Sequence, residues 1–285
     1  MFHSGKVLPS FLDCTFSQIR LFNPAVAIYF LTDKHLGLDP IFEKYNIISL
    51  NKDAFYSNKV KEFEMLYNRK SEDFWTITAT RLIYIENFLI SYKLKNVYHF
   101  ENDVLLYYNL KEHHATFRRL YDHLAITTGG SDKSMTGFLF IKDGDALSQM
   151  TQHFIDLLKI YGISGLKKKY HMDMVNEMTL MKIYTDAKYL PILPFGDYSE
   201  NYMAFDSIFD PASWGQFVGG TMDGIPGAKP QDHYIGQLLD KNPDYSVVWG
   251  IDDENRKIPY FKYNGNEVKI NNLHIHSKNL SLYMS

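Results

Sequence analysis

Two carboxylates stand close together in the middle of the chain, directly after an apolar run. Glu101-Asn102-Asp103 follows Asn96-Val97-Tyr98-His99-Phe100, a short segment with the composition of a strand. In an extended chain Glu101 and Asp103 point to the same side, because side chains alternate along a strand. Two hard carboxylates on one side can hold Mg²⁺ or Mn²⁺, directly or through water. The alternative is a solvated turn at the end of a strand.

A second group of ligand-type side chains lies near the C-terminal end of the sequence. In the segment Asn271–Lys278, polar and apolar residues alternate. As a strand, it would place His274, His276 and Lys278 on one face, with Leu273 and Ile275 on the other. Three cations on one face would repel one another. Neutral imidazoles facing a metal ion, with the lysine facing phosphate, remove that conflict. The alternative is a surface strand with a polar outer face.

Together these two groups predict a divalent metal site. We expect Asp103 and His276 to bind one Mn²⁺ or Mg²⁺ ion, with Glu101 near it and His274 as the second imidazole. His276 is preferred to His274 because it is adjacent, on the same face, to Lys278, the expected phosphate contact.

Three further charged residues stand out by their position. Arg81 lies in a largely apolar helical pattern, where a guanidinium needs an anion, either an internal carboxylate or a nucleotide phosphate. Asp173 and Glu177 are four residues apart in a predicted helix and would share a face. That face is either solvated or carries a general base that acts on a hydroxyl group.

The elements that must position these residues follow from hydrophobic periodicity. The apolar run from Ala25 to Leu31 reads as a buried strand that ends in the polar residues Thr32 and Asp33. Further strands and helices alternate after it, which predicts an α/β fold with a mostly parallel sheet. The expected strands are 46–50, 96–100 and 137–141, and the expected helices are 73–94, 146–161 and 172–184. From Pro191 on, glycine and proline are dense, so we expect long loops or hairpins there.

Composition narrows the possible classes. The chain has 285 residues and a formal net charge of -3, so no global basic field attracts nucleic acid. The single cysteine, Cys14, cannot form an internal disulfide and is expected to be a buried thiol, which fits a reducing compartment. No secretory signal or membrane-spanning run is visible, so we expect a soluble protein of the cytoplasm, or of the host cytoplasm or virion if the source is viral.

Several segments, in their order along the chain, resemble glycosyltransferases of the GT-A type. Leu31-Thr32-Asp33 resembles their uridine-contacting segment, and the helix with Arg81 followed by Val97–Asp103 resembles the stretch that leads into their DxD motif. Glu101 replaces the first Asp of a strict motif, which makes Asp103 the safer ligand. The other matching segments are 136–140, 176–180, 209–221 and 272–278. The last two are the most specific and resemble putative enzymes of bacteria and large DNA viruses.

The resemblance implies one GT-A domain over residues 1–285, a Rossmann-like α/β fold with a mostly parallel mixed sheet and helices on both faces. Residues 1–103 would bind the nucleotide, and residues 104–285 would form the acceptor half and the C-terminal metal-binding segment. The implied reaction moves a sugar from a nucleoside diphosphate sugar, with UDP as the best match, to a hydroxyl group of a glycan, a protein or a small molecule.

The resemblance also implies roles for single residues. The nucleotide would lie across Thr32, Asp33 and Asn102, with Arg81 and Lys278 at the phosphates. Glu177 would be the catalytic base, because it holds the matching position in the resembling motif, and Asp173 is the second choice.

Two other classes remain open at the level of sequence. One is a sugar nucleotidyltransferase, although the start of the chain, Phe2–Lys6, lacks the glycine- and arginine-rich loop of that class. The other is a catalytically inactive carbohydrate-binding protein. We also expect the segment from Asp210 to Gly227 to border the acceptor cleft. There, Trp214 either offers a ring to a sugar or packs inside, and Gly219-Gly220 permits close backbone approach.

Overall fold

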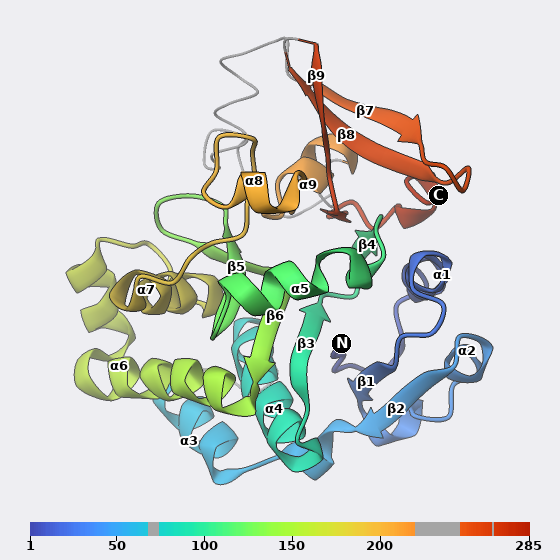
Figure 1. The fold of residues 1–285 in the computed structure, drawn as a ribbon. Helices are drawn as coiled ribbons and strands as arrows, with labels where there is room; N and C mark the ends of the chain where they lie inside the picture. Colours follow the sequence, from blue (N-terminus) through green and yellow to red (C-terminus); the bar gives the residue numbers. More distant parts are fainter. Residues whose placement is uncertain (68–73, 220–245, 264) are drawn as a thin grey trace.

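Strands run through the middle of the molecule and carry helices on both sides (Figure 1). The computed structural model describes residues 1–67, 74–219, 246–263 and 265–285. The strands are β1 Ile28–Thr32, β2 Ile47–Asn51, β3 Lys95–Phe100, β4 Val104–Leu106, β5 Leu124–Thr128, β6 Ser134–Asp143, β7 Ser246–Ile251, β8 Lys257–Tyr263, β9 Asn266–Lys269 and β10 Asn272–His274.

The strands form four small groups. β1 and β2 pair in parallel. β3, β6 and β5 pair antiparallel in that order, as do β7, β8 and β9, and β10 pairs antiparallel with β4. The mixed α/β class is therefore confirmed, whereas a single, mostly parallel sheet is not. Within the described ranges, parallel pairing is confined to β1–β2 and two isolated bridges, Phe2–Leu31 and Ile208–Ile270. An apolar run shows that a strand is buried but does not give the direction of its neighbour.

The helices complete the layers. They are α1 Leu12–Phe22, α2 Pro40–Lys44, α3 Asn58–Tyr67, α4 Phe74–Tyr92, α5 Leu110–Leu120, α6 Gly144–Tyr170, α7 Glu177–Lys188, α8 Tyr202–Phe205 and α9 Trp214–Gly219. None of the helices in the described ranges combines the length and the apolar character that crossing a bilayer requires. Cys14 is a half-buried free thiol in α1, less enclosed than the buried thiol that we expected.

Strand β6 shows how the sequence places helices on both faces of the central strands. Leu139 and Ile141 belong to a core cluster with α3, α4, α6 and α7. Phe138 and Phe140 point the other way, into a cluster with α1 and α5. This continuous apolar run is what a strand covered on both faces requires.

Two predicted helices differ from those observed. The first, α6, begins at Gly144 and continues to Tyr170, past a kink at Gly162, whose φ is 58°. The second begins at Glu177 and not at Met172, because Asn176 and Thr179 form a capping box at its start. Asp173 lies in the bend before α7 and is exposed. The prediction that Asp173 shares a helical face with Glu177 is therefore wrong.

A third core cluster joins β4 and β7–β10 to the segment around α9. Trp214 is fully buried in it, with its ring centroid 4.8 Å from that of Phe261 and its indole N–H donating to the carbonyl of Phe195 at 3.2 Å. Trp214 is thus a packed side chain and does not offer a ring to a sugar. The expected glycine-rich border of an acceptor cleft lies partly outside the described residues, from Gly220 to Gly227.

Truncation of this indole should cost stability. We expect Trp214→Ala to lower the free energy of unfolding by about 3–5 kcal/mol, the cost of removing a large buried side chain. Urea unfolding followed by circular dichroism measures this loss. The half-buried Trp249 is the matched control, and Trp249→Ala should cost clearly less. Equal losses for the two variants would contradict the central role of Trp214.

Candidate metal centre

The turn after β3 and the end of β10 meet in space. The backbone N–H of Glu101 donates to the carbonyl of Gly137 at 3.0 Å, which holds the turn against β6. β10 pairs antiparallel with β4, so that His274 lies opposite Val104, and the N–H of Ile275 donates to the carbonyl of Asp103 at 2.9 Å. The C-terminal strand therefore brings His274 beside the acidic turn.

Three side chains converge there with the donor set of a metal centre. His274 Nε2 lies 3.1 Å from Asp103 Oδ2 and 3.5 Å from Glu101 Oε2. One donor atom from each residue lies within 4.8 Å of those from the other two. Asp103 and His274 are buried, and Glu101 is half-buried. Two carboxylates and an imidazole this close together are compatible with a divalent ion such as Mn²⁺ or Mg²⁺.

Basic side chains beside the cluster stabilise the negative charges of its carboxylates. Burial alone would raise the pKa of Asp103, but His274 and Lys278 hold it far below its usual range. Burial likewise acts to lower the pKa of His274, yet the Asp103 and Glu101 carboxylates raise it overall. The His274 imidazole and the Lys278 ammonium group thus both act electrostatically to stabilise the ionised form of Asp103.

Lys278 reaches the cluster from a turn, not from a strand. Its φ is 64°, and its backbone N–H donates to the carbonyl of Ile275 at 3.1 Å. β10 ends at His274, so the prediction that His274, His276 and Lys278 share one face of a strand is wrong. The turn nevertheless directs the Lys278 ammonium group onto Asp103 Oδ2.

His276 lies next to His274 but outside the converging set. The two rings meet edge to face, with centroids 4.4 Å apart. Burial, and then the neighbouring His274, lower the pKa of His276 to about 3, so that this imidazole is neutral at pH 7. The geometry therefore favours His274 over His276 as the ligand, which reverses the order expected from sequence.

Arg81 holds the second acid of the cluster in place. Glu101 Oε1 accepts from Arg81 Nη2 at 2.8 Å and from the hydroxyl of Thr136 at 2.6 Å. Burial opposes ionisation of Glu101, but Arg81 and His274 lower its pKa overall. Glu101 Oε2 is thereby turned toward His274. Of the two partners expected for Arg81, the structure shows the internal carboxylate. Thr136 begins the matching segment 136–140, but nothing in the sequence assigned it this contact.

Asp210 ties the backbone of His274 to the start of α9. Its Oδ1 accepts from the N–H groups of Ser213 and Trp214 at 2.7 and 2.8 Å. Its Oδ2 accepts from those of Gly215 and His274, both at 2.8 Å. The sequence analysis placed Asp210 at the start of the expected border of the acceptor cleft and did not predict this role for it.

Two glycines leave the space that His274 occupies. A Cβ at Gly137 would lie 2.6 Å from His274 Nδ1, and one at Gly215 would lie 2.3 Å from the carbonyl oxygen of His274. Both distances are well inside van der Waals contact, so either methyl group would displace the residue.

A methyl group at position 215 should therefore disturb metal binding without removing a ligand. We expect Gly215→Ala to weaken Mn²⁺ binding about 10- to 100-fold, the usual cost of displacing a support of a metal ligand. Titration calorimetry with Mn²⁺ measures the affinity. Gly37→Ala is the control, because a Cβ there makes only an ordinary 3.4 Å contact with the carbonyl of Lys34. Normal Mn²⁺ affinity of Gly215→Ala would show that His274 does not depend on this support.

Glu177 lies near the centre on a different element, at the first position of α7. It is buried, and its Oε2 accepts from the hydroxyl of Thr78 at 2.9 Å. Burial raises the pKa of Glu177 to about 7; the nearby Arg81 acts against this shift, and Glu101 adds to it. A carboxyl group with this pKa can take up or release a proton near neutral pH.

The residues expected to contact the nucleotide lie at the ends of β1 and β3. The hydroxyl of Thr32 and Oδ1 of Asn102 are buried and have no hydrogen-bond partner within the described part of the chain. Asp33 is already engaged, since it accepts from the N–H of Gly5 at 2.9 Å and pairs with Lys52 at 3.1 Å. Thr32 and Asn102 therefore each carry an unpaired polar atom that the protein encloses, whereas Asp33 would have to exchange partners to bind a ligand.

Comparison with known proteins finds similarity among solved structures but none at the level of sequence. No protein-family model matches the chain, and no curated protein matches its sequence. Among solved structures, the chain is similar to mouse xyloside xylosyltransferase 1 in its apo form, with 8% sequence identity and a TM-score of 0.49. The match covers 67% of this chain and 82% of that one.

Proposed function

We propose that this chain is a divalent-metal-dependent glycosyltransferase that moves a sugar from a nucleoside diphosphate sugar to a hydroxyl group. The observation that carries the proposal is the convergence of Glu101, Asp103 and His274 beside Lys278. Residues 1–103 would bind the nucleotide, which we expect to be UDP. Residues 104–285 would form the acceptor side.

The leaving group of such a reaction is a nucleoside diphosphate, whose negative charge grows as the bond to the sugar breaks. Glu101, Asp103 and His274 would hold a divalent ion, which would supply positive charge against this increase. The chain itself would contribute Lys278, whose ammonium group pairs with Asp103 and is within reach of any anion bound there. Thr32 and Asn102 would orient the nucleoside through their unpaired polar atoms.

Activation of the acceptor requires a group that removes a proton from the attacking hydroxyl. Glu177 is the first choice, because its pKa of about 7 suits a base at neutral pH and its helix begins beside the cluster. Asp173 is exposed in the preceding bend and is the second choice.

Arg81 should matter for donor binding through Glu101. Loss of a charge-assisted bond costs about 1.5–3 kcal/mol, which corresponds to roughly tenfold or more in affinity. We therefore expect Arg81→Ala to weaken Mn²⁺-dependent UDP binding at least about tenfold, as measured by calorimetry. Arg81→Lys, which keeps the charge, should lose less. If Arg81→Ala lowers only the melting temperature and leaves UDP affinity intact, Arg81 is a purely structural partner of Glu101.

One experiment tests the proposal as a whole. The protein is incubated with a panel of nucleotide sugars in Mn²⁺, Mg²⁺ or EDTA, and the released nucleotide is measured. We expect metal-dependent release from one donor class, above all a UDP-sugar. Release of pyrophosphate from a nucleoside triphosphate and a sugar phosphate would instead indicate a nucleotidyltransferase. Sugar binding without any turnover would indicate a carbohydrate-binding protein.

A further inference from the structure

Helix α4 makes one polar contact to each of two acidic groups near the candidate metal centre. Arg81 Nη2 donates to Glu101 Oε1 at 2.8 Å, and the hydroxyl of Thr78 donates to Glu177 Oε2 at 2.9 Å. Thr78 and Arg81 are three residues apart, so they lie on the same side of the helix, about one turn from each other. A single turn of α4 therefore holds both a candidate metal ligand and the candidate base.

The Thr78 hydroxyl has a second acceptor within reach. It lies 3.1 Å from the backbone carbonyl oxygen of Trp75, in the preceding turn of α4. A hydroxyl group has one hydrogen to donate and two lone pairs with which to accept. The hydrogen of Thr78 can therefore point to Glu177 or to the carbonyl of Trp75.

These two orientations suit the two protonation states of Glu177. When the carboxyl group is ionised, its Oε2 accepts the hydrogen of Thr78. When Oε2 carries a proton, it can donate that proton to the Thr78 oxygen, while the Thr78 hydrogen turns to the carbonyl of Trp75. Glu177 is 3% exposed, and a buried polar group without a partner is costly. Rotation of one hydroxyl thus keeps Oε2 bonded before and after a proton is taken up.

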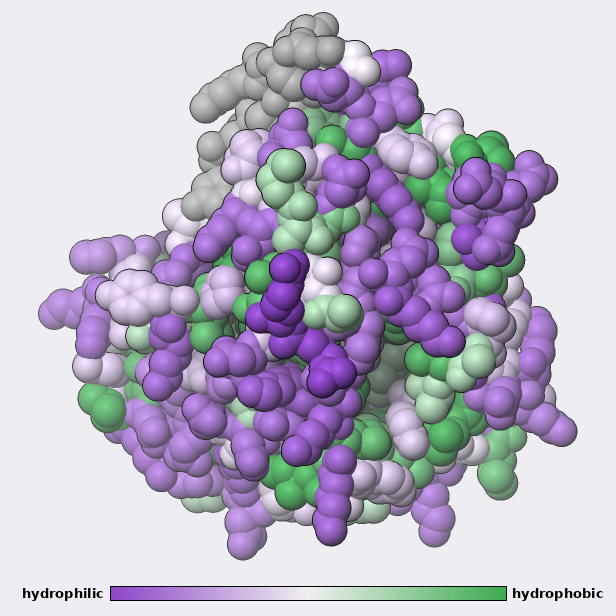
Figure 2. All heavy atoms as spheres, in the orientation of Figure 1, coloured by the Kyte–Doolittle hydropathy of each residue, from purple (hydrophilic) through white to green (hydrophobic). Residues whose placement is uncertain are grey.

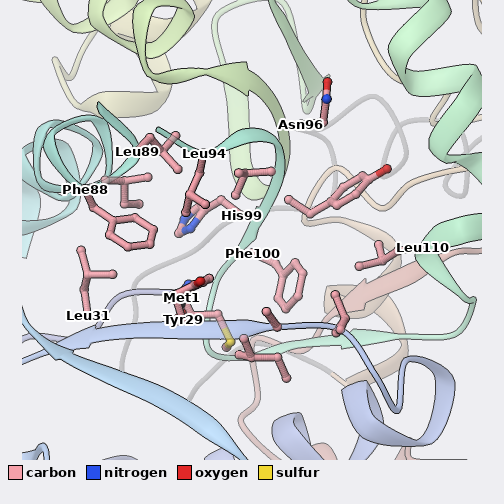
Figure 3. A pocket seen from close by; sticks show the side chains of 16 residues that line it. Met1, Tyr29, Leu31, Phe88, Leu89, Leu94, Asn96, His99, Phe100 and Leu110 are labelled. Atoms are coloured by element: carbon pink, nitrogen blue, oxygen red, sulfur yellow. Dashed lines mark hydrogen bonds between the residues drawn. The ribbon is translucent and has the colours of Figure 1, made fainter. Parts of the chain in front are cut away.

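Water in a cavity is the alternative partner for a buried carboxyl group. A cavity of about 210 Å³ lies between β1 and β3 and has an almost wholly apolar lining (Figure 3). In the orientation of Figure 1, Figure 2 likewise shows a hollow with hydrophobic surface at its floor. A polar groove of about 500 Å³ lies between α6 and the last turns of α7. Neither Thr78 nor Glu177 lines the cavity or the groove, so water there could not replace the Thr78 hydroxyl.

We propose that Thr78 is a positioning residue for Glu177, because its hydroxyl holds the carboxyl group in place and stays bonded to it in both protonation states. The inference rests on the proposed function, in which Glu177 takes a proton from the acceptor. In that step the acceptor O–H bond breaks and its proton goes to Glu177. The electron pair left on the oxygen forms the bond to the sugar carbon as the nucleoside diphosphate leaves. Thr78 gains no proton and loses none.

The groups that face Glu177 act in opposite directions on its pKa. Burial raises this pKa to about 7; Arg81 lowers it, Glu101 raises it, and the bond from Thr78 lowers it. A donor stabilises the ionised carboxylate more than the protonated acid. Loss of the Thr78 hydroxyl should therefore raise the pKa of Glu177 further.

The test compares Thr78→Val, which removes the hydroxyl, with Thr78→Ser, which retains it. Loss of a bond to a charged group corresponds to about tenfold or more in the acid dissociation constant of Glu177. We therefore expect the pH of half-maximal kcat to rise by about one unit in Thr78→Val. At pH 7 its kcat should fall at least about fivefold, because less of the base is ionised. Mn²⁺-dependent UDP affinity should not change, and Thr78→Ser should keep the parent pH profile.

Thr80→Val is the matched control, because it removes a hydroxyl from the same helix. The hydroxyl of Thr80 donates to the backbone carbonyls of Thr76 and Ile77, at 2.8 and 3.3 Å. We expect the parent pH profile in this variant. If Thr78→Val does not fold, Thr78→Ala takes its place in the same comparison.

A second readout does not depend on transfer. Urea unfolding is measured in EDTA between about pH 5 and pH 9, with and without Glu177→Gln in each background. The difference isolates the stability that is lost as Glu177 ionises in the native state. In the parent this loss should end near pH 7, and in Thr78→Val it should continue to about pH 8.

The two readouts separate this inference from the proposed function. If the chain transfers no sugar, the proposed function fails, and the unfolding curves alone decide whether Thr78 holds Glu177. An unchanged pH range of the stability loss in Thr78→Val overturns the inference. It is also overturned if transfer occurs and the pH profile of kcat stays unchanged, or if Thr78→Ser shifts the profile as far as Thr78→Val.

Discussion

Asp103→Asn should abolish metal-dependent nucleotide binding while leaving the fold intact. Asp103 is 5% exposed, and its Oδ2 is shared between His274 and Lys278. Asparagine keeps the shape but removes the charge, so His274 and Lys278 lose their common anion and the metal loses its central carboxylate. Removal of a support behind a ligand already costs 10- to 100-fold in metal affinity. We therefore expect a loss of at least about 100-fold in Mn²⁺-dependent UDP affinity.

Calorimetry with UDP, in Mn²⁺ and in EDTA, measures this loss. Asp13→Asn is the matched control, because Asp13 forms an exposed pair with Lys44 far along the chain from the cluster. It should bind UDP and Mn²⁺ normally. Unchanged UDP affinity and metal dependence in Asp103→Asn would disprove the metal centre.

Glu177→Gln should remove turnover with little effect on donor binding. If Glu177 accepts the proton of the attacking hydroxyl, its loss should lower kcat by about 10²- to 10⁴-fold. In the unmodified protein kcat should rise with pH through about 7, the pKa of Glu177, because only the ionised form is a base. Asp173→Asn, at the exposed second candidate, should turn over normally. Normal kcat in Glu177→Gln would exclude it as the base, and a loss of donor binding would identify it as a contact to the donor sugar.

Glu177→Gln should also change how the free energy of unfolding depends on pH. The pKa of Glu177 is raised from 4.5 to about 7, so the native state favours the protonated form. The contribution of this group to the free energy of unfolding is fully present below about pH 4.5, the pKa of the carboxyl group in the unfolded chain. It is lost as the pH rises from about 4.5 to 7. A shift of this size corresponds to about 3 kcal/mol. Glutamine carries no charge, so Glu177→Gln should unfold at higher urea than the parent at pH 8 and at a similar concentration at pH 4. This readout is independent of activity.

The sequence predicted the individual strands well, because each is a short apolar run that ends in polar residues. β1, β2, β3 and β6 lie within a few residues of their predicted positions, and α4 coincides with the long pattern free of glycine and proline. Pairing is a property of distant segments, and periodicity carries no information about it. The antiparallel order β3–β6–β5 could not be predicted for this reason.

The residues of the candidate metal centre were largely predicted from the sequence, but their arrangement was not. Glu101 and Asp103 follow β3 as expected, and His274 and Lys278 reach them from the C-terminal segment. The preference for His276 rested on a strand that continued to Lys278. The chain instead turns after Ile275, and Lys278 adopts a left-handed conformation that nothing in its local sequence requires.

The residues that hold the candidate metal ligands in place were the least predictable part of the site. Asp210 accepts four backbone bonds, and Thr136 bonds Glu101, yet both residue types are common in loops and strands. Their roles depend on which backbone groups the tertiary fold leaves unpaired near them. The capping box of Asn176 and Thr179 was readable, and it would have placed Glu177 at a helix start and Asp173 outside the helix.

The pairing of β4 with β10 has a consequence for how the chain folds. Asp103 and Lys278 are 175 residues apart, so their meeting closes one of the longest loops in the molecule. Closing such a loop is entropically unfavourable, and contacts of this range form slowly compared with helices and local hairpins. The ligand set is therefore incomplete in any intermediate that has its helices but has not docked its last strand. Only a chain that has reached its native topology would then bind the metal, and a chain that has formed its helices alone would not.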